Sequence, residues 1–221
     1  MNRTWNAAKL DYYASKSMLR MISALVLIGV IVGLAAHGPN YTMLFVMVFA
    51  VTSSGSVFSV HEKSHSDKLY GILPLTKSEM ILGRYLYALA IGFAYLLAGG
   101  ILGFFMWKIM GESAHTTALS YWATLALAFA YFCFATGVAY PIYFKFSFAK
   151  AYVFTMIPMY VVAVLMLFLT RRTDFQGGLA SAAAFFAAHV YLLPLFGLLA
   201  GLALLALSAL TANLIYTRRE I

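Results

Sequence analysis

Charged residues are scarce in this chain. They make up 10% of its 221 residues, whereas hydrophobic residues make up 63%. Soluble domains carry about 25% charged residues, so this composition excludes an ordinary soluble fold. Apolar runs of about 20 residues recur along the chain, and this is the length that crosses a bilayer core of roughly 30 Å. The sequence therefore predicts an all-α integral membrane protein.

Nucleotide-binding motifs and cysteine pairs are also missing. No G-x-x-x-x-G-K-[S/T] phosphate loop occurs, and the spans leave no room for a nucleotide-binding domain, so ATP chemistry in this chain is excluded. The single cysteine, Cys133, cannot form an internal disulfide and is expected to pack as a small hydrophobic residue. No Asp, Glu, Lys or Arg stands at the middle of a predicted span, which argues against a proton-coupled carrier.

Six apolar segments are predicted to cross the membrane and to form a single domain over residues 18–221, with a cytoplasmic loop at 61–78. Their ranges are Met18–Ala36, Tyr41–Val60, Glu79–Trp107, Leu119–Tyr143, Ala151–Thr170 and Tyr191–Tyr216.

The basic residues are distributed unevenly between the two sides of these spans. One side has Arg3, Lys9, Lys16, Arg20, Lys63, Lys68, Lys77, Arg84, Lys145, Lys150, Arg218 and Arg219. The other side has Lys108, Arg171 and Arg172. Because Lys and Arg concentrate in cytoplasmic segments, both termini are predicted to be cytoplasmic. This scatter at span ends also argues against nucleic acid as a partner, despite the net charge of +8.

Two segments are predicted not to span. Residues 1–17 are expected to form an interfacial helix leading into the first span, although Asp11 does not fit a clean amphipathic pattern. The basic and aromatic residues that indicate this helix are Lys9, Lys16, Arg20, Tyr12 and Tyr13. A signal peptide is the alternative, and the length of the basic segment argues against it. The apolar residues 179–188 are too few to cross and are expected to be re-entrant or interfacial on the outer side.

Two interpretations of the segment from His61 to Leu86 compete. In the first, His61-Glu62-Lys63-Ser64-His65 matches H-E-x-x-H, in which two His bind zinc on one helical face and Glu activates water. The third ligand is the difficulty, since only Asp67, Glu79 or Glu220 is available on the same side. A membrane-embedded zinc metalloprotease using His61 and His65 is therefore the alternative function, and the favoured interpretation has no metal.

In the second interpretation the segment is a cytoplasmic loop that enters the third span. Pro74 disfavours helix in the residue before it and can open a new turn. Thr76 followed by Glu79 is a capping box, so the span is expected to start there. Upstream, Asp67 to Leu73 mixes charged with apolar residues, and a short helix of this composition fits a groove in a soluble partner.

The same segment resembles a known family. The matching residues are Glu62-Lys63-Ser64, Asp67-Lys68-Leu69-Tyr70, Leu73-Pro74-Leu75-Thr76-Lys77-Ser78-Glu79 and Arg84-Tyr85-Leu86. They are similar to a loop pattern of bacterial type-two ABC exporter permeases, small six-span subunits also classed as type V. His61 stands where that family usually has Asp, which makes the zinc motif look accidental.

The resemblance implies that the chain is the permease subunit of an ATP-driven exporter and not itself an enzyme. The loop would be the coupling helix seated on a separate ABC ATPase, with roles for Glu62, Lys63, Asp67, Tyr70, Leu73 and Pro74. ATP and magnesium would bind to that partner, and no cofactor would bind to this chain. A second permease copy or a sister permease would complete the transporter in the bacterial cytoplasmic membrane.

The cargo is expected to be amphipathic or hydrophobic, because the spans offer no charged lining, and the resemblance favours a peptide. The candidate lining residues are Thr52, Ser53, Ser56, Ser59, Met156, Met159 and Tyr160. For the polar residues of the second span, hydrogen bonds across a helix interface or to the preceding turn are the alternatives. Gly99-x-x-x-Gly103 and Gly197-x-x-x-Gly201 predict close helix packing, and Asn213 is expected to bond between helices. A structural or immunity membrane protein without turnover is the third hypothesis.

Overall fold

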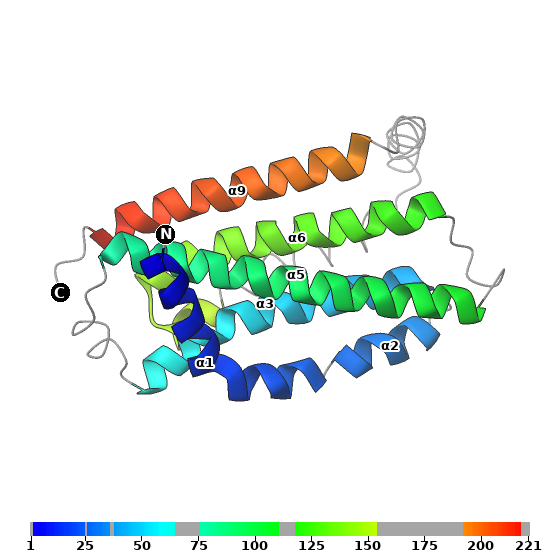
Figure 1. Ribbon diagram of the computed structural model, residues 1–221, viewed down its shortest axis with the longest axis horizontal. Coiled ribbons are helices and arrows are strands. Elements are labelled where there is room, and N and C mark those ends of the chain that lie inside the picture. The colour runs from blue at the N-terminus through cyan, green and yellow to red at the C-terminus, as the bar shows by residue number, and fades with distance from the viewer. Residues whose placement is uncertain are drawn as a thin grey trace.

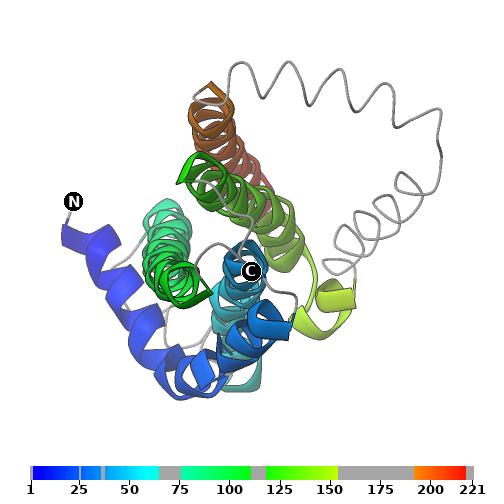
Figure 2. The ribbon, with the colours of Figure 1, turned by 90° about the vertical axis from the view of Figure 1, so that its right-hand side faces the viewer.

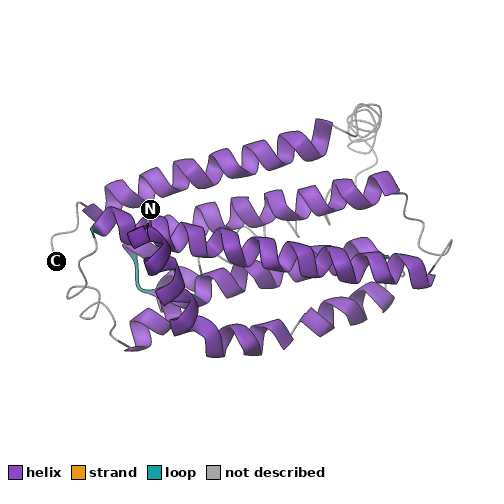
Figure 3. Ribbon diagram, viewed as in Figure 1, coloured by secondary structure: helices purple, strands orange, loops and turns teal. Residues whose placement is uncertain are grey.

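The computed structural model describes residues 2–24, 26–35, 38–64, 76–110, 118–153 and 192–217. Within these ranges the regular structure is helical and contains no strand (Figure 3). The helices are α1 (Asn2–Ala24), α2 (Val26–Ala35), α3 (Pro39–Ser64), α5 (Lys77–Met110), α6 (Ala118–Lys145) and α9 (Leu192–Thr217), labelled in Figure 1.

Among the residues that the structure describes, five helical stretches are long and apolar enough to cross a membrane. They are Arg3–Ala35, Pro39–Ser64, Lys77–Met110, Tyr121–Lys145 and Leu195–Tyr216. These stretches confirm the predicted all-α membrane class and correspond to five of the six predicted spans. The other predicted span, Ala151–Thr170, lies outside the described residues after residue 153, as does the predicted outer segment 179–188.

The helix boundaries differ from the predicted ones at the N-terminus. The sequence predicts a boundary after Ser17, but α1 continues through that position to Ala24, and α2 follows from Val26. Figure 1 shows that the early part of α1 crosses one end of the bundle and that the later part turns to run alongside it. The described residues of the first candidate span, Arg3–Ala35, thus belong to α1 and α2.

Basic residues at the ends of several helices lie at one end of the bundle, which we call the basic end. Lys63 and Lys145 lie in the last turns of α3 and α6, and Lys77 begins α5, whereas Lys108 lies in the last turn at the other end of α5. Figure 1 shows that α1 begins and α9 ends at this same end. The end of α3 and the start of α5, which flank the predicted loop in sequence, are therefore both at the basic end.

The helices pack around a centre formed by α3 and α5. Helix α5 contacts α1 and α3, and α6 contacts α3 and α9. In the end-on view of Figure 2, α1 and α2 lie on one side of this centre and the α6 and α9 pair on the other. The largest fully buried side chains come from α6 and α3, among them Tyr140, Phe129, Phe132, Met43 and Met47.

Glycines bring neighbouring helices close together, as their spacing predicts. A Cβ added at Gly103 of α5 would lie 2.7 Å from Cε of Met43 in α3. A Cβ added at Gly201 of α9 would lie 3.0 Å from Cβ of Cys133 in α6. Cys133 is fully buried there, which confirms its predicted packing as a small hydrophobic residue.

Candidate functional site

The candidate site is the basic end of the bundle, where the loop predicted to couple to an ATPase joins α3 to α5. Four of its predicted residues, Asp67, Tyr70, Leu73 and Pro74, lie outside the described residues. The structure does describe both roots of the loop. Glu62 and Lys63 are exposed in the last turn of α3, and Thr76 and Glu79 stand at the start of α5.

The root of the loop at α5 has reciprocal capping bonds. The Thr76 N–H donates to Glu79 Oε2 at 2.8 Å, and the Glu79 N–H donates to Thr76 Oγ1 at 3.2 Å. These are the two bonds of a capping box, which satisfies amide groups that the first turn of a helix leaves without partners. The start of α5, and with it one end of the loop, is thereby fixed at residue 76.

Two more polar contacts tie this end together. Glu62 Oε2 accepts the N–H of Phe148 at 2.5 Å, at the start of a helical turn over residues 148–153. A carboxylate in this position is favoured by the orphan amides and the dipole of a helix N-terminus. Ser78 Oγ donates to Oδ1 of Asn213 at 3.0 Å, so the predicted interhelical bond of Asn213 is confirmed.

A buried charged network joins α1, α3 and α5 toward the basic end. Asp11 of α1 is 1% exposed, and its Oδ1 lies 3.0 Å from Nε2 of His61 in α3. Its Oδ2 lies 3.9 Å from Nε of Arg84 in α5, an ion pair at a longer distance than a hydrogen bond. His61 and Arg84 are each 5% exposed. One carboxylate thus joins three helices at the two roots of the loop.

Aromatic rings surround the Arg84 guanidinium. Its Cζ lies 4.8 Å from the ring centroid of Phe58 in α3 and 5.3 Å from that of Phe144 in α6. Such cation–π contacts are strongest where water is excluded. Phe144 in turn packs edge-on against Tyr216 of α9, with ring centroids 5.7 Å apart. The network therefore reaches the other two helices that end at the basic end.

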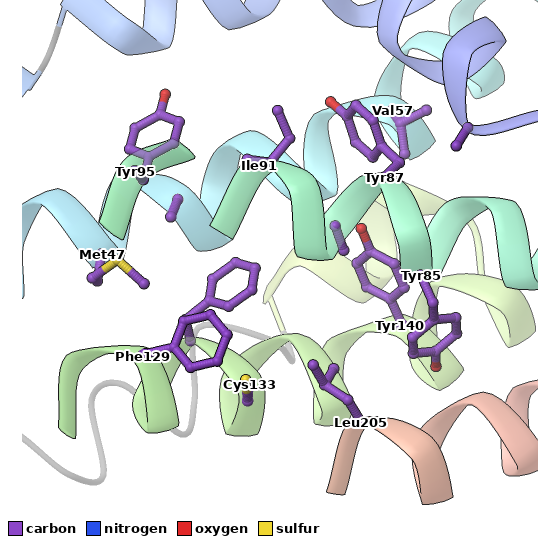
Figure 4. Close-up of a cluster of buried hydrophobic side chains, with 14 of the residues drawn as sticks. Met47, Val57, Tyr85, Tyr87, Ile91, Tyr95, Phe129, Cys133, Tyr140 and Leu205 are labelled. Carbon is purple, nitrogen blue, oxygen red and sulfur yellow. The ribbon is translucent and has the colours of Figure 1, made fainter. Parts of the chain in front are cut away.

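Two tyrosines of α5 continue the polar contact between α1 and α5. Tyr87 OH lies 2.8 Å from Ser15 Oγ, and Tyr95 OH lies 3.2 Å from Ser23 Oγ, each pair separated by 72 residues in sequence. The constant separation means that α1 and α5 run parallel with one register. Figure 4 shows Tyr87 and Tyr95 pointing from the same side of α5, and Tyr85 pointing the other way.

The predicted lining residues of α3 lie in packed helix contacts. Ser53 Oγ is 2.7 Å from the hydroxyl of Tyr95 in α5. Ser56 Oγ donates to the Ser53 carbonyl at 2.6 Å, and Thr52 Oγ1 donates to the carbonyl of Val48 at 3.3 Å. The two predicted alternatives, a hydrogen bond across a helix interface and a hydrogen bond to the preceding turn, therefore both occur. Ser59 is buried, and Met156, Met159 and Tyr160 lie outside the described residues.

The structure gives His61 a carboxylate neighbour from α1. The ring of His61 is buried and its Nε2 is held by Asp11. No group of three or more His, Cys, Asp and Glu side chains with the geometry to hold a metal ion occurs among the described residues. His65 lies outside these residues.

Sequence reasoning missed Asp11 as a site residue. Its signal was present, because Ala7, Ala8, Asp11 and Ser15 share one stripe at helical spacing, and all four are buried. Small residues on one stripe indicate a packed face, and an acidic residue on such a face requires a partner. The partner itself depends on how the helices pack, which one helix pattern does not specify.

The fold and site together define a multi-pass α-helical membrane protein with a loop root stabilised at one end of the bundle. A model of the family described as "ABC-2 family transporter protein" matches residues 8–217, which is nearly the whole chain, and the chain belongs to this family. It is thus a permease component of an ABC transporter, a kind of subunit that is typically non-enzymatic and works with a partner ATPase. No curated protein and no solved structure matches the chain.

Proposed function

We propose that the chain is the permease subunit of an ATP-driven exporter of the small six-span, type V class. It moves an amphipathic or hydrophobic cargo, with a peptide favoured, outward across the bacterial cytoplasmic membrane. A separate ABC ATPase that holds ATP and magnesium docks on the loop at 61–78. A second permease copy or a sister permease completes the pathway.

The observation that carries this proposal is the family match over residues 8–217, which contains the whole loop. The geometry adds support at the loop roots. Glu79 and Thr76 fix the start of α5, and Glu62 bonds to Phe148 beyond the end of α6. A force applied to the loop would therefore reach α3, α5 and the chain after α6 together.

The basic end is proposed to face the cytoplasm. Positive residues concentrate in cytoplasmic segments, and Lys63, Lys77 and Lys145 at the described ends of α3, α5 and α6 lie at this end of the bundle. Labelling tests this in a Cys133→Ala background. Lys63→Cys is expected to react with an impermeant maleimide only in inverted vesicles, and Lys108→Cys only in right-side-out vesicles.

The early part of α1 is proposed to lie in the membrane interface. Its buried face packs on α5, where a Cβ added at Gly83 would lie 2.7 Å from Cβ of Ala7. Its outer face carries exposed Arg3, Lys9, Lys16 and Arg20 beside exposed Trp5, Tyr12 and Tyr13. Basic and aromatic side chains together are typical of helices at the headgroup level.

The decisive experiment is co-purification from mild detergent with an ABC ATPase, followed by an ATPase assay and metal analysis of the same sample. We expect a stable complex that hydrolyses ATP. Glu62→Gln is expected to weaken the complex or lower its ATPase rate, because the charge that caps residues 148–153 is lost. Lys108→Gln, at the opposite end of α5, is the matched control and should leave both unchanged.

A different result would identify the alternative enzyme. A chain that purifies alone with stoichiometric zinc, and that loses zinc and proteolysis in His61→Ala with His65→Ala, would establish the membrane metalloprotease. A chain that purifies alone with neither zinc nor ATPase partner would favour the structural or immunity protein.

A further inference from the structure

One side chain of the N-terminal helix, Asp11, contacts both helices that flank the loop, α3 and α5. Asp11 is the only acidic residue in α1, and it faces inward, where it meets His61 near the end of α3 and Arg84 near the start of α5. These two residues flank the loop on either side in sequence. A movement of either root must therefore displace Asp11 or break its contacts.

The contacts of Asp11 are buried and link groups of complementary chemistry. Its carboxyl group lies beside the Arg84 guanidinium and within hydrogen-bond distance of the His61 ring. Removing one member of a buried pair is unfavourable because the other member stays desolvated. The contact is therefore suited to transmitting motion.

The rest of α1 supports a rigid attachment. The Cβ of Ala7 and the Thr4 carbonyl lie so close to Gly83 that an added Cβ there would be 2.7 and 3.1 Å from them. One turn after Gly83 in α5, the hydroxyl of Tyr87 forms a hydrogen bond with Ser15 of α1. These contacts join α1 to α5. The Asp11–His61 contact adds a direct polar link from α1 to α3, which also pack against each other.

We infer that Asp11 is a positioning residue for energy coupling: it makes α1 move as one body with both roots of the ATPase-docking loop. The N-terminal helix is then part of the moving element, and its aromatic and basic outer face is carried along when the partner ATPase closes. This inference rests on the proposed function, because it requires a loop that an ATPase moves.

The test measures a distance in the assembled complex of permease and ATPase in lipid nanodiscs. Spin labels are placed at Tyr13→Cys on α1, a position 69% exposed, and at Val60→Cys on α3, in a Cys133→Ala background. Distances are measured without nucleotide and after trapping with ATP and vanadate. The parent is expected to show one narrow distance in both states. Asp11→Asn is expected to show an added or shifted distance in the trapped state.

The controls separate coupling from stability. Ser15→Ala removes a contact of α1 to α5 and leaves the contact to His61, so its distance should match the parent. The exchange Asp11→His with His61→Asp restores a carboxylate–imidazole pair and should restore the single distance. If Asp11→Asn does not assemble, His61→Gln breaks the same contact from the other side and takes its place.

Three outcomes decide the inference. A trapped-state change in Asp11→Asn that the exchange reverses supports it. One identical distance in the parent and in Asp11→Asn, with ATP hydrolysis intact, overturns it and leaves the proposed function standing. A parent chain that forms no ATP-hydrolysing complex overturns the proposed function and the inference together.

Discussion

The hydroxyl of Ser208 in α9 donates to the carbonyl of Gly137 in α6 at 2.6 Å. Gly137 is the residue whose carbonyl would accept from position 141 in a regular helix, but Pro141 has no N–H to donate. Because the Ser208 hydrogen is used in this bond, Ser208 Oγ accepts from Tyr85 OH at 2.6 Å. A proline in α6 is thus compensated by a relay that also binds α5 and α9.

This relay predicts that Ser208→Ala destabilises the protein. The free energy of unfolding is expected to fall by about 1 kcal/mol. An average interhelical hydrogen bond in a membrane protein contributes about 0.6 kcal/mol, and a buried polar group left without a partner costs about 1–3 kcal/mol. Thermal unfolding in detergent measures it. In a Pro141→Ala background residue 141 supplies the missing N–H, so Ser208→Ala should cost less there. An equal cost in both backgrounds would show that the proline is not what the serine compensates.

The capping box predicts a local effect at the start of α5. Thr76→Ala removes the side-chain acceptor for the Glu79 N–H. The free energy of unfolding should fall by about 1 kcal/mol as a result. Hydrogen exchange of the amides at residues 78–80 should become faster, and ATPase stimulation in the complex should fall, because the loop root is no longer fixed. Thr76→Ser keeps the acceptor and serves as control. Unchanged exchange in Thr76→Ala would mean that the cap does not hold this turn.

The parts of this fold that follow from the local sequence were predicted well. Long apolar runs, glycine spacing and the Asn213 position depend on one helix and its nearest neighbours, and the structure agrees with each of them. The Thr76 and Glu79 pair also belongs to this class, because both members lie within one helical turn. The family match over residues 8–217 agrees with the predicted class of permease.

The buried network could not be derived in this way. Asp11 and His61 are 50 residues apart, and their contact depends on the register of α1 against α3 and α5. Local spacing offered only a zinc motif with His65 as a role for His61, and this was the alternative interpretation, because H-E-x-x-H is a pattern within one helix.

The close approach of α1 to α5 predicts that Gly83 tolerates no larger residue. In Gly83→Ala the new methyl group would meet Ala7 and the Thr4 carbonyl, so α1 must shift at a cost of about 1–3 kcal/mol. Thermal stability should fall, and the bond between Ser15 and Tyr87 should weaken. Gly100→Ala is the matched control, since its nearest neighbour is a flexible Leu125 methyl at 3.4 Å. Equal stability of the two variants would argue against this packing.

The outer face of α1 predicts a dependence on anionic lipid. Lys9, Lys16 and Arg20 are exposed, and the one acidic residue of the helix, Asp11, is turned inward, so no negative charge offsets them on that face. Each basic residue near an anionic surface contributes about 1 kcal/mol to binding, and salt screens this attraction. The triple variant Lys9→Gln, Lys16→Gln, Arg20→Gln should therefore weaken the association of α1 with vesicles that contain phosphatidylglycerol.

Fluorescence of a probe at Tyr13→Cys, in the Cys133→Ala background, measures this association in reconstituted protein. The parent should respond when phosphatidylglycerol replaces phosphatidylcholine, and the response should shrink as salt is raised. The triple variant should respond little in either lipid, whereas Lys108→Gln should behave as the parent does. A response of equal size in the parent and the triple variant would place the basic face of α1 away from the headgroups, because the same charges cannot be at an anionic surface and contribute nothing to its attraction.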